Sequence, residues 1–117
     1  MKLYGLNRLK RIVIGDDSFG KVRQFGLVAM NELESVVIGE RSFTTSVTNG
    51  STIYFGQKDG VYRIINCPKL QEIDIGDDSF SDYKIFELEN LPSLEVLFFG
   101  EWCFSIASIR LTGLLDV

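Results

Sequence analysis

The sequence predicts a mostly β fold: a solenoid of about four 24-residue coils with two short parallel strands per coil and an inserted β-hairpin. The prediction rests on a phrase of eleven residues that occurs four times in the 117-residue chain, because such self-similarity is typical of repeat architectures. Successive copies place their glycine 24, 37 and 24 residues apart, which indicates one regular coil and a single insertion of 13 residues. The copies are Leu9–Phe19, Leu33–Phe43, Leu70–Phe80 and Leu94–Phe104.

Each copy of the phrase predicts a short strand followed by a tight turn. Its apolar residues alternate with a period of two, as on a strand with one buried face, at Ile12/Ile14, Val36/Ile38, Ile73/Ile75 and Leu97/Phe99. The glycine that follows suits a sharp turn, for which a positive φ is one geometry. The hydroxyls of Ser18, Ser42 and Ser79 can bond the turn backbone. We expect the last residue of each copy to join a nearly fully buried phenylalanine spine: Phe19, Phe43, Phe80 and Phe104.

The rest of each coil also repeats and predicts a second, looser strand opposite the first. Apolar residues recur at equal offsets in two coils, as Val22, Phe25, Leu27, Met30 and Leu33, and as Tyr83, Phe86, Leu88, Leu91 and Leu94. We therefore expect a single domain over residues 1–117. Its coils are predicted at about 3–26, 27–63, 64–87 and 88–111, with a partial coil to residue 117.

The inserted residues, at about 45–57 in the second coil, predict a protruding β-hairpin. β-Branched residues flank Asn49-Gly50, and this dipeptide is the strongest short signal for a hairpin turn. Asn49-Gly50-Ser51 is also an N-glycosylation sequon. Asn49 is therefore a candidate modification site, although the turn alone explains the asparagine.

The stretch Leu91–Phe104, LPSLEVLFFGEWCF, follows the leucine-rich repeat pattern L-x-x-L-x-x-L-x-L. With its IGxxSF turn and second apolar strand, the coil resembles the BspA-like subgroup, which is common in surface proteins of bacteria and unicellular eukaryotes. The resemblance covers the chain apart from about 13 inserted residues. It implies a right-handed solenoid used for protein recognition, with no catalytic residues. The usual turn asparagine of leucine-rich repeats is replaced here by a glycine–acid pair.

Composition argues against several classes of function. The chain has no histidine, which removes histidine-based acid–base and nucleophilic chemistry and most zinc sites. We therefore expect neither enzyme activity nor a cofactor. The net charge of −4, without a basic stripe, argues against nucleic acid. We expect no membrane insertion, because the longest apolar run, Val96–Phe99, is far short of the roughly 20 residues of a membrane span.

The two cysteines fall at different positions of the repeat. Cys67 takes the place of Met30 and Leu91, a core position, whereas Cys103 takes the place of the turn serines. We therefore expect free thiols with structural roles. Free thiols and an N-terminus without a signal-peptide core favour the cytoplasm, whereas the family resemblance favours the cell surface, so the localisation stays open.

The outward positions of the first strand column form the candidate binding surface. The residues at these positions differ from coil to coil, whereas the framework residues of the repeat stay the same. Two of the positions carry aromatic residues, which are typical interface anchors when they are exposed. We expect Phe98 and Trp102 to be substantially exposed; the alternative is that they pack under the hairpin or in an oligomer contact. The candidate site comprises Lys10, Val13, Glu34, Val37, Gln71, Asp74, Glu95, Phe98 and Trp102.

A column of acids follows the phrase glycines: Asp16, Glu40, Asp77 and Glu101. Stacked about 4.8 Å apart, these carboxylates are weak candidates for binding a hard cation such as Ca²⁺. Neighbouring donors such as Arg11 and Arg41 can neutralise them instead.

Two functions are consistent with the sequence. One is a non-enzymatic module that binds a protein partner through the first strand column. The other is a structural fragment of a longer array that self-assembles end to end as a homo-oligomer, because both ends cut the coil at the same phase without the polar caps of solenoids.

Residues 1–58 carry 8 Lys/Arg against 5 Asp/Glu (+3), and residues 59–117 carry 4 against 11 (−7). The opposite charges of the two ends favour head-to-tail contact, but an exposed ion pair contributes little to the free energy of association. Covering the apolar ends contributes more, and we expect it to favour a closed dimer in which like ends meet.

Overall fold

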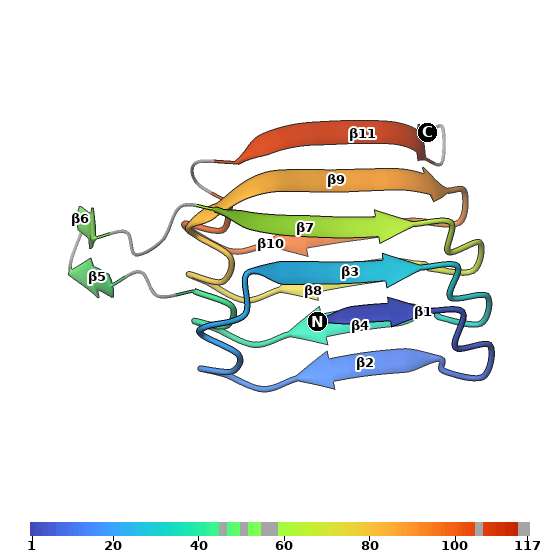
Figure 1. The fold of residues 1–117 in the computed structure, drawn as a ribbon, viewed down its shortest axis with the longest axis horizontal. Coiled ribbons are helices and arrows are strands. Elements are labelled where there is room, and N and C mark those ends of the chain that lie inside the picture. Colours follow the sequence, from blue (N-terminus) through green and yellow to red (C-terminus); the bar gives the residue numbers. More distant parts are fainter. Residues whose placement is uncertain (45–46, 50–51, 55–58, 105–106, 115–117) are drawn as a thin grey trace.

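The computed structural model describes residues 1–44, 47–49, 52–54, 59–104 and 107–114. These residues contain strands and turns but no helix. The chain winds between two facing parallel sheets and so forms a β-solenoid of about four turns (Figure 1). The predicted mostly β solenoid, with two short parallel strands per coil, is confirmed.

The looser strands of the sequence form sheet A, and the strands of the repeated phrase form sheet B. In both sheets neighbouring strands are one coil apart, so the register follows the spacing: Leu3 lies beside Leu27, and Val36 beside Ile73. Sheet A contains β1 (Lys2–Tyr4), β3 (Gln24–Val28), β7 (Gly60–Ile65), β9 (Tyr83–Leu91) and β11 (Ser108–Leu114). Sheet B contains β2 (Arg11–Ile14), β4 (Ser35–Ile38), β8 (Glu72–Ile75) and β10 (Val96–Phe99).

The insertion in the second coil forms an antiparallel pair, β5 (Val47–Asn49) and β6 (Thr52–Tyr54), in which Asn49 lies opposite Thr52. The pair projects away from the two sheets (Figure 1), which confirms the predicted inserted hairpin. Residues 50–51, which include Gly50 of the predicted turn, residues 45–46 and 55–57 of the predicted segment, and the side chain of Asn49 lie outside the described part of the chain.

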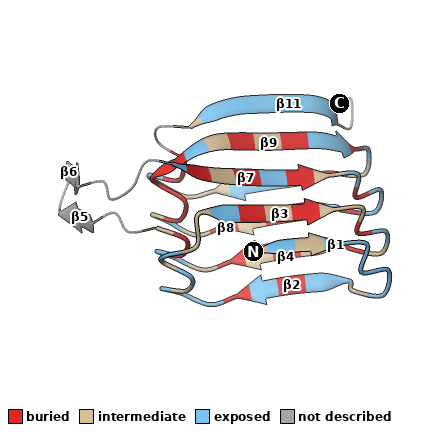
Figure 2. Ribbon diagram, in the orientation of Figure 1, coloured by how far each residue is buried: buried red, intermediate tan, exposed pale blue. Residues whose placement is uncertain are grey.

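The aromatic spine is part of the buried core, whose residues concentrate in the central coils (Figure 2). Phe43 and Phe80 are 0% exposed and Phe104 is 5% exposed, and the stacked ring centroids lie 4.6 Å apart for Phe43–Phe80 and 5.1 Å for Phe80–Phe104. The expectation for Phe19 was wrong, since this side chain is 48% exposed. Phe19 is the outermost ring of the stack and packs on Phe43 with one face only.

The phrase glycines do not serve the turn through a positive φ, because the described glycines with positive φ are Gly5 and Gly113. Gly39, Gly76 and Gly100 are needed instead because adjacent coils approach closely, whereas a Cβ on Gly15, in the first coil, would meet nothing within 4 Å. A Cβ on Gly39 would lie 2.2 Å from the Asp16 carboxylate, and one on Gly76 would lie 2.8 Å from the Glu40 backbone nitrogen. The left-handed conformations fall on other turn residues, including all four spine phenylalanines, with φ between 50° and 56°.

The turn serines bond the backbone, as predicted, and they thereby link successive coils. The Ser42 hydroxyl donates to the Gly15 carbonyl at 2.8 Å, and the Ser79 hydroxyl donates to the Gly39 carbonyl at 2.7 Å. In the last coil Cys103 takes this place, with its thiol 3.0 Å from the Gly76 carbonyl. Both cysteines are free and buried, as predicted.

Candidate functional site

The outer face of sheet B is the candidate binding surface, and the structure brings the predicted outward column together on it. Val13, Val37, Asp74 and Phe98 lie side by side in register across β2, β4, β8 and β10. Val13 and Phe98 are 64% and 57% exposed, whereas Val37 and Asp74 are half-buried by their neighbours on either side. The column is therefore an apolar row interrupted by one carboxylate.

A second outward row lies two residues earlier on the same strands and was missed by the sequence reasoning. It consists of Arg11, Ser35, Glu72 and Val96. The Ser35 hydroxyl lies 3.1 Å from a Glu72 carboxylate oxygen, and Val96 is 47% exposed. The signal was present, because the period of two that selects Val13 also places Arg11 on the outer face.

Four polar residues were predicted to flank the outward column. They lie along the edge of sheet B at which the strands begin. Lys10, Glu34, Gln71 and Glu95 are all exposed. Their backbones form a ladder, in which the amides of Glu34, Gln71 and Glu95 donate to the preceding residue of the series at 2.8–2.9 Å. Glu34, Gln71 and Glu95 also border an open hollow of about 330 Å³ against the second outward row.

Phe98 and Trp102 are both exposed, at 57% and 38%, so the expectation of substantial exposure is confirmed. They occupy different parts of the coil, however. Phe98 stands on β10 beside Asp74. Trp102 lies in the following turn at a left-handed position (φ 69°) equivalent to that of Asp17, Arg41 and Asp78. Phe98 is therefore the aromatic residue of the sheet B outer face itself.

The acidic column takes part in bonds between coils. The Asp16 carboxylate accepts a hydrogen bond from the Glu40 amide at 2.7 Å, and the Asp77 carboxylate accepts one from the Glu101 amide at 2.9 Å. Arg41 pairs with Glu40 and with Asp17 at 3.0 and 2.8 Å, and this contact lowers the pKa of the Asp17 carboxyl. In the described ranges, no group of three or more His, Cys, Asp or Glu residues is arranged to hold a metal ion.

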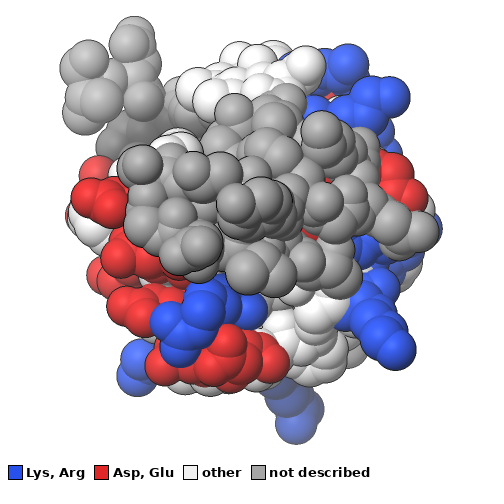
Figure 3. Space-filling model, turned by 90° about the vertical axis from the view of Figure 1, so that its left-hand side faces the viewer, with Lys and Arg blue, Asp and Glu red and all other residues white. Residues whose placement is uncertain are grey.

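Charge is unevenly distributed around the solenoid. Seen from the hairpin side, acidic side chains gather on one flank and basic side chains lie mainly on the other (Figure 3). The sheet B outer face carries Glu72 and Asp74 against Arg11, with Glu34 and Glu95 against Lys10 at its edge.

The chain matches no protein-family model, no curated protein and no solved structure. Across the residues that the structure describes, no helix is long and apolar enough to cross a membrane.

Proposed function

We propose that the chain is a leucine-rich repeat solenoid of the BspA-like kind and acts as a non-enzymatic protein-binding module through the sheet B outer face. The observation that carries the proposal is Phe98, a 57% exposed aromatic side chain on a face of otherwise short or polar side chains. Exposed apolar groups rimmed by polar residues mark interaction sites, and buried aromatic anchors dominate binding energies. The repeat pattern carries the family assignment, and a β-solenoid of about four turns is compatible with it.

The test compares Phe98→Glu with Val13→Glu, which places the same charge in the same row three strands away at a similarly exposed position. A partner is captured with the wild-type chain, purified and titrated against each variant. We expect Phe98→Glu to weaken binding about 30-fold or more, as for a hot spot, and Val13→Glu to weaken it less. Both melting temperatures should stay near the wild-type value, because outward positions contribute little to the core. Equal affinities for the wild type and Phe98→Glu would contradict the proposal.

End-to-end self-assembly is a second candidate, supported by the exposure of inward-facing residues in β11. Ile109 and Leu111 are 56% and 52% exposed, whereas their register partners one coil earlier, Phe86 and Leu88, are 1% and 0% exposed. Covering such side chains contributes about 25 cal/mol per Å² before the costs of association. Sedimentation of the 117-residue chain at low and high salt tests this candidate. Association that Leu111→Glu abolishes and that persists at high salt would support it, and a strict monomer would exclude it.

A further inference from the structure

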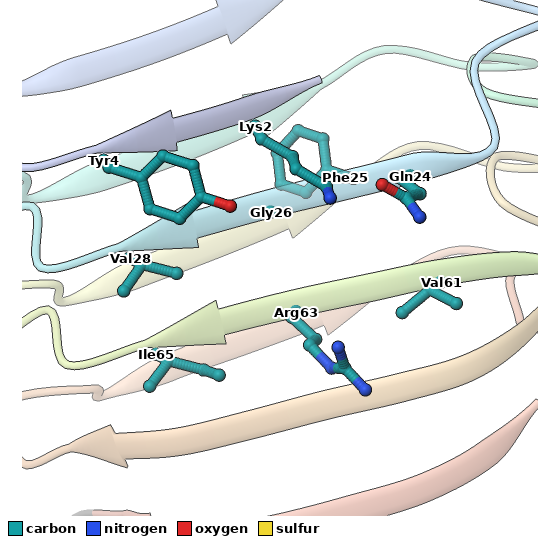
Figure 4. Close-up of a pocket in the computed structure, with 9 residues that line it drawn as sticks. All are labelled: Lys2, Tyr4, Gln24, Phe25, Gly26, Val28, Val61, Arg63 and Ile65. Carbon is teal, nitrogen blue, oxygen red and sulfur yellow. The ribbon is translucent and has the colours of Figure 1, made fainter.

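The outer face of sheet A contains a hollow that the sequence analysis did not anticipate. Outward-facing residues lie in register across its strands, in the order Lys2, Gly26, Arg63, Glu87 and Arg110. Because Gly26 has no side chain, the row has a gap of about 210 Å³ that is open to solvent. Tyr4, Val28, Val61 and Ile65 contribute its apolar walls, and Lys2 and Arg63 flank it (Figure 4).

The fold itself does not require a glycine at position 26. Its φ lies outside the left-handed region, and a Cβ placed there would meet only Lys2 Cγ, at an ordinary contact distance of 3.7 Å. Glycine within a strand weakens the strand and often marks a place where another chain approaches closely. Gly26 therefore points to an occupant of the hollow.

Phe98 on the opposite sheet is an exposed aromatic side chain, the kind of group that an apolar hollow binds. It protrudes from the sheet B outer face on β10, and its neighbour in the row is Asp74, one strand away. We propose that Phe98 of a second copy of this chain inserts into the hollow over Gly26. The inference rests on the proposed role of Phe98 as the anchor of the sheet B face, and it names the partner of that face as the chain itself.

Charge complementarity supports this choice of occupant. Strands in a sheet lie about 4.8 Å apart, so Asp74 stands one strand from Phe98, and cations stand one strand from Gly26 on both sides. When the strands of the two facing sheets are aligned, either direction of the second copy brings its Asp74 over Lys2 or Arg63. Lys2 has no ion-pair partner among the described residues. Arg63 uses its Nε to bond Glu87 at 2.9 Å. Within the described ranges its terminal nitrogens form no ion pair, so they can bind a further carboxylate.

The contact is heterologous, because it joins different faces of the two copies. Each copy in a pair keeps one unused Phe98 or one unused hollow, so wild-type association does not close on a dimer. The same property allows a complementation test. A chain that lacks the protruding ring still has the hollow, and a chain with a filled hollow still has the ring.

The experiment follows the sedimentation of Gly26→Val and Phe98→Glu, alone and mixed in equal amounts, over a concentration series that extends into the millimolar range. The Gly26→Val variant fills the hollow with a β-branched side chain that suits a strand; Thr112→Val, on β11 away from the hollow, is the matched control. We expect each variant alone to associate about 30-fold or more weakly than wild type. The mixture should form a species of two chains and nothing larger, and Thr112→Val should behave as wild type.

Melting temperatures establish that each variant is folded, and Gly26→Thr replaces Gly26→Val if the latter unfolds. A wild-type chain that stays monomeric at every concentration overturns the inference but leaves recognition of another protein by Phe98 intact. Association that Phe98→Glu weakens but Gly26→Val does not also overturns it, because the ring then binds elsewhere. A mixture that fails to form the two-chain species overturns it as well.

Discussion

The largest single stabilising contribution in this fold is expected from Phe80, the central ring of the spine. Its side chain is 0% exposed and packs against five aromatic rings, with centroids between 4.6 and 5.6 Å away: Phe25, Phe43, Tyr62, Tyr83 and Phe104. Phe80→Ala removes these contacts and leaves a cavity that rigid stacked coils cannot close. We expect it to lower the free energy of unfolding by about 3–5 kcal/mol, the range for buried phenylalanine.

Phe19 provides the matched control. It occupies the same position of the coil with nearly the same φ, 56° against 55°, so backbone strain is equal in the two variants. Its side chain is 48% exposed and stacks on Phe43 alone. We therefore expect Phe19→Ala to cost about 1 kcal/mol, roughly half the burial contribution of a phenylalanine. Urea unfolding followed by circular dichroism gives both values. Equal losses, or a loss below about 1 kcal/mol for Phe80→Ala, would refute the assignment of the spine.

The remaining predictions concern other buried or strained positions. Tyr62→Phe should raise the free energy of unfolding by about 1 kcal/mol, since its buried hydroxyl has no hydrogen-bond partner among the described atoms; a destabilised variant would reveal a partner. Ala29→Asn should stabilise by about 1 kcal/mol, because Ala29 has φ 54° at a position where another coil places Asn66 at 56°; the reverse change, Asn66→Ala, should destabilise. Burial raises the pKa of the Cys103 thiol to about 11, so alkylation of the native protein should be slow at neutral pH and accelerate as the pH approaches that value. Fast modification of Cys103 at neutral pH, located by peptide mass spectrometry, would contradict this.

Much of the fold follows from local pattern. The spacings of 24 and 37 residues define which residues are neighbours, and the register of sheet B agrees with them, as Val13 beside Val37 and Asp74 beside Phe98 show. Asn49-Gly50 indicated the hairpin because turn type depends on neighbouring residues alone. The repeat also predicted the positions of both cysteines, Cys67 in a core column and Cys103 in the column of the turn serines. These features need only periodicity and residue type, so they could be inferred without coordinates.

The candidate site was less predictable, because it depends on how coils meet. Alternation alone places Phe98 and Val13 on the outer face, and it also places Arg11, Ser35, Glu72 and Val96 there, although the sequence interpretation did not include this second row. Trp102 was grouped with the sheet, whereas the turn places it in another column. The backbone at that position is left-handed in every coil. The residues that occupy it are two aspartates, an arginine and a tryptophan, and these types share no sequence signal for a left-handed backbone.

Short-range periodicity is enough to establish the repeat, the two strands per coil, the hairpin and the identity of the core columns. The remaining features depend on how the coils pack in three dimensions. The side chain of Phe19 is exposed because a ring of the spine is fully buried only when a coil lies on each side of it. Gly39 and Gly76 are required by close approach between coils, since the clashing atoms lie 23 or more residues away. The hollow at Gly26 is also a result of packing. The missing side chain leaves a hollow only because the strand register places Lys2 and Arg63 on its two sides.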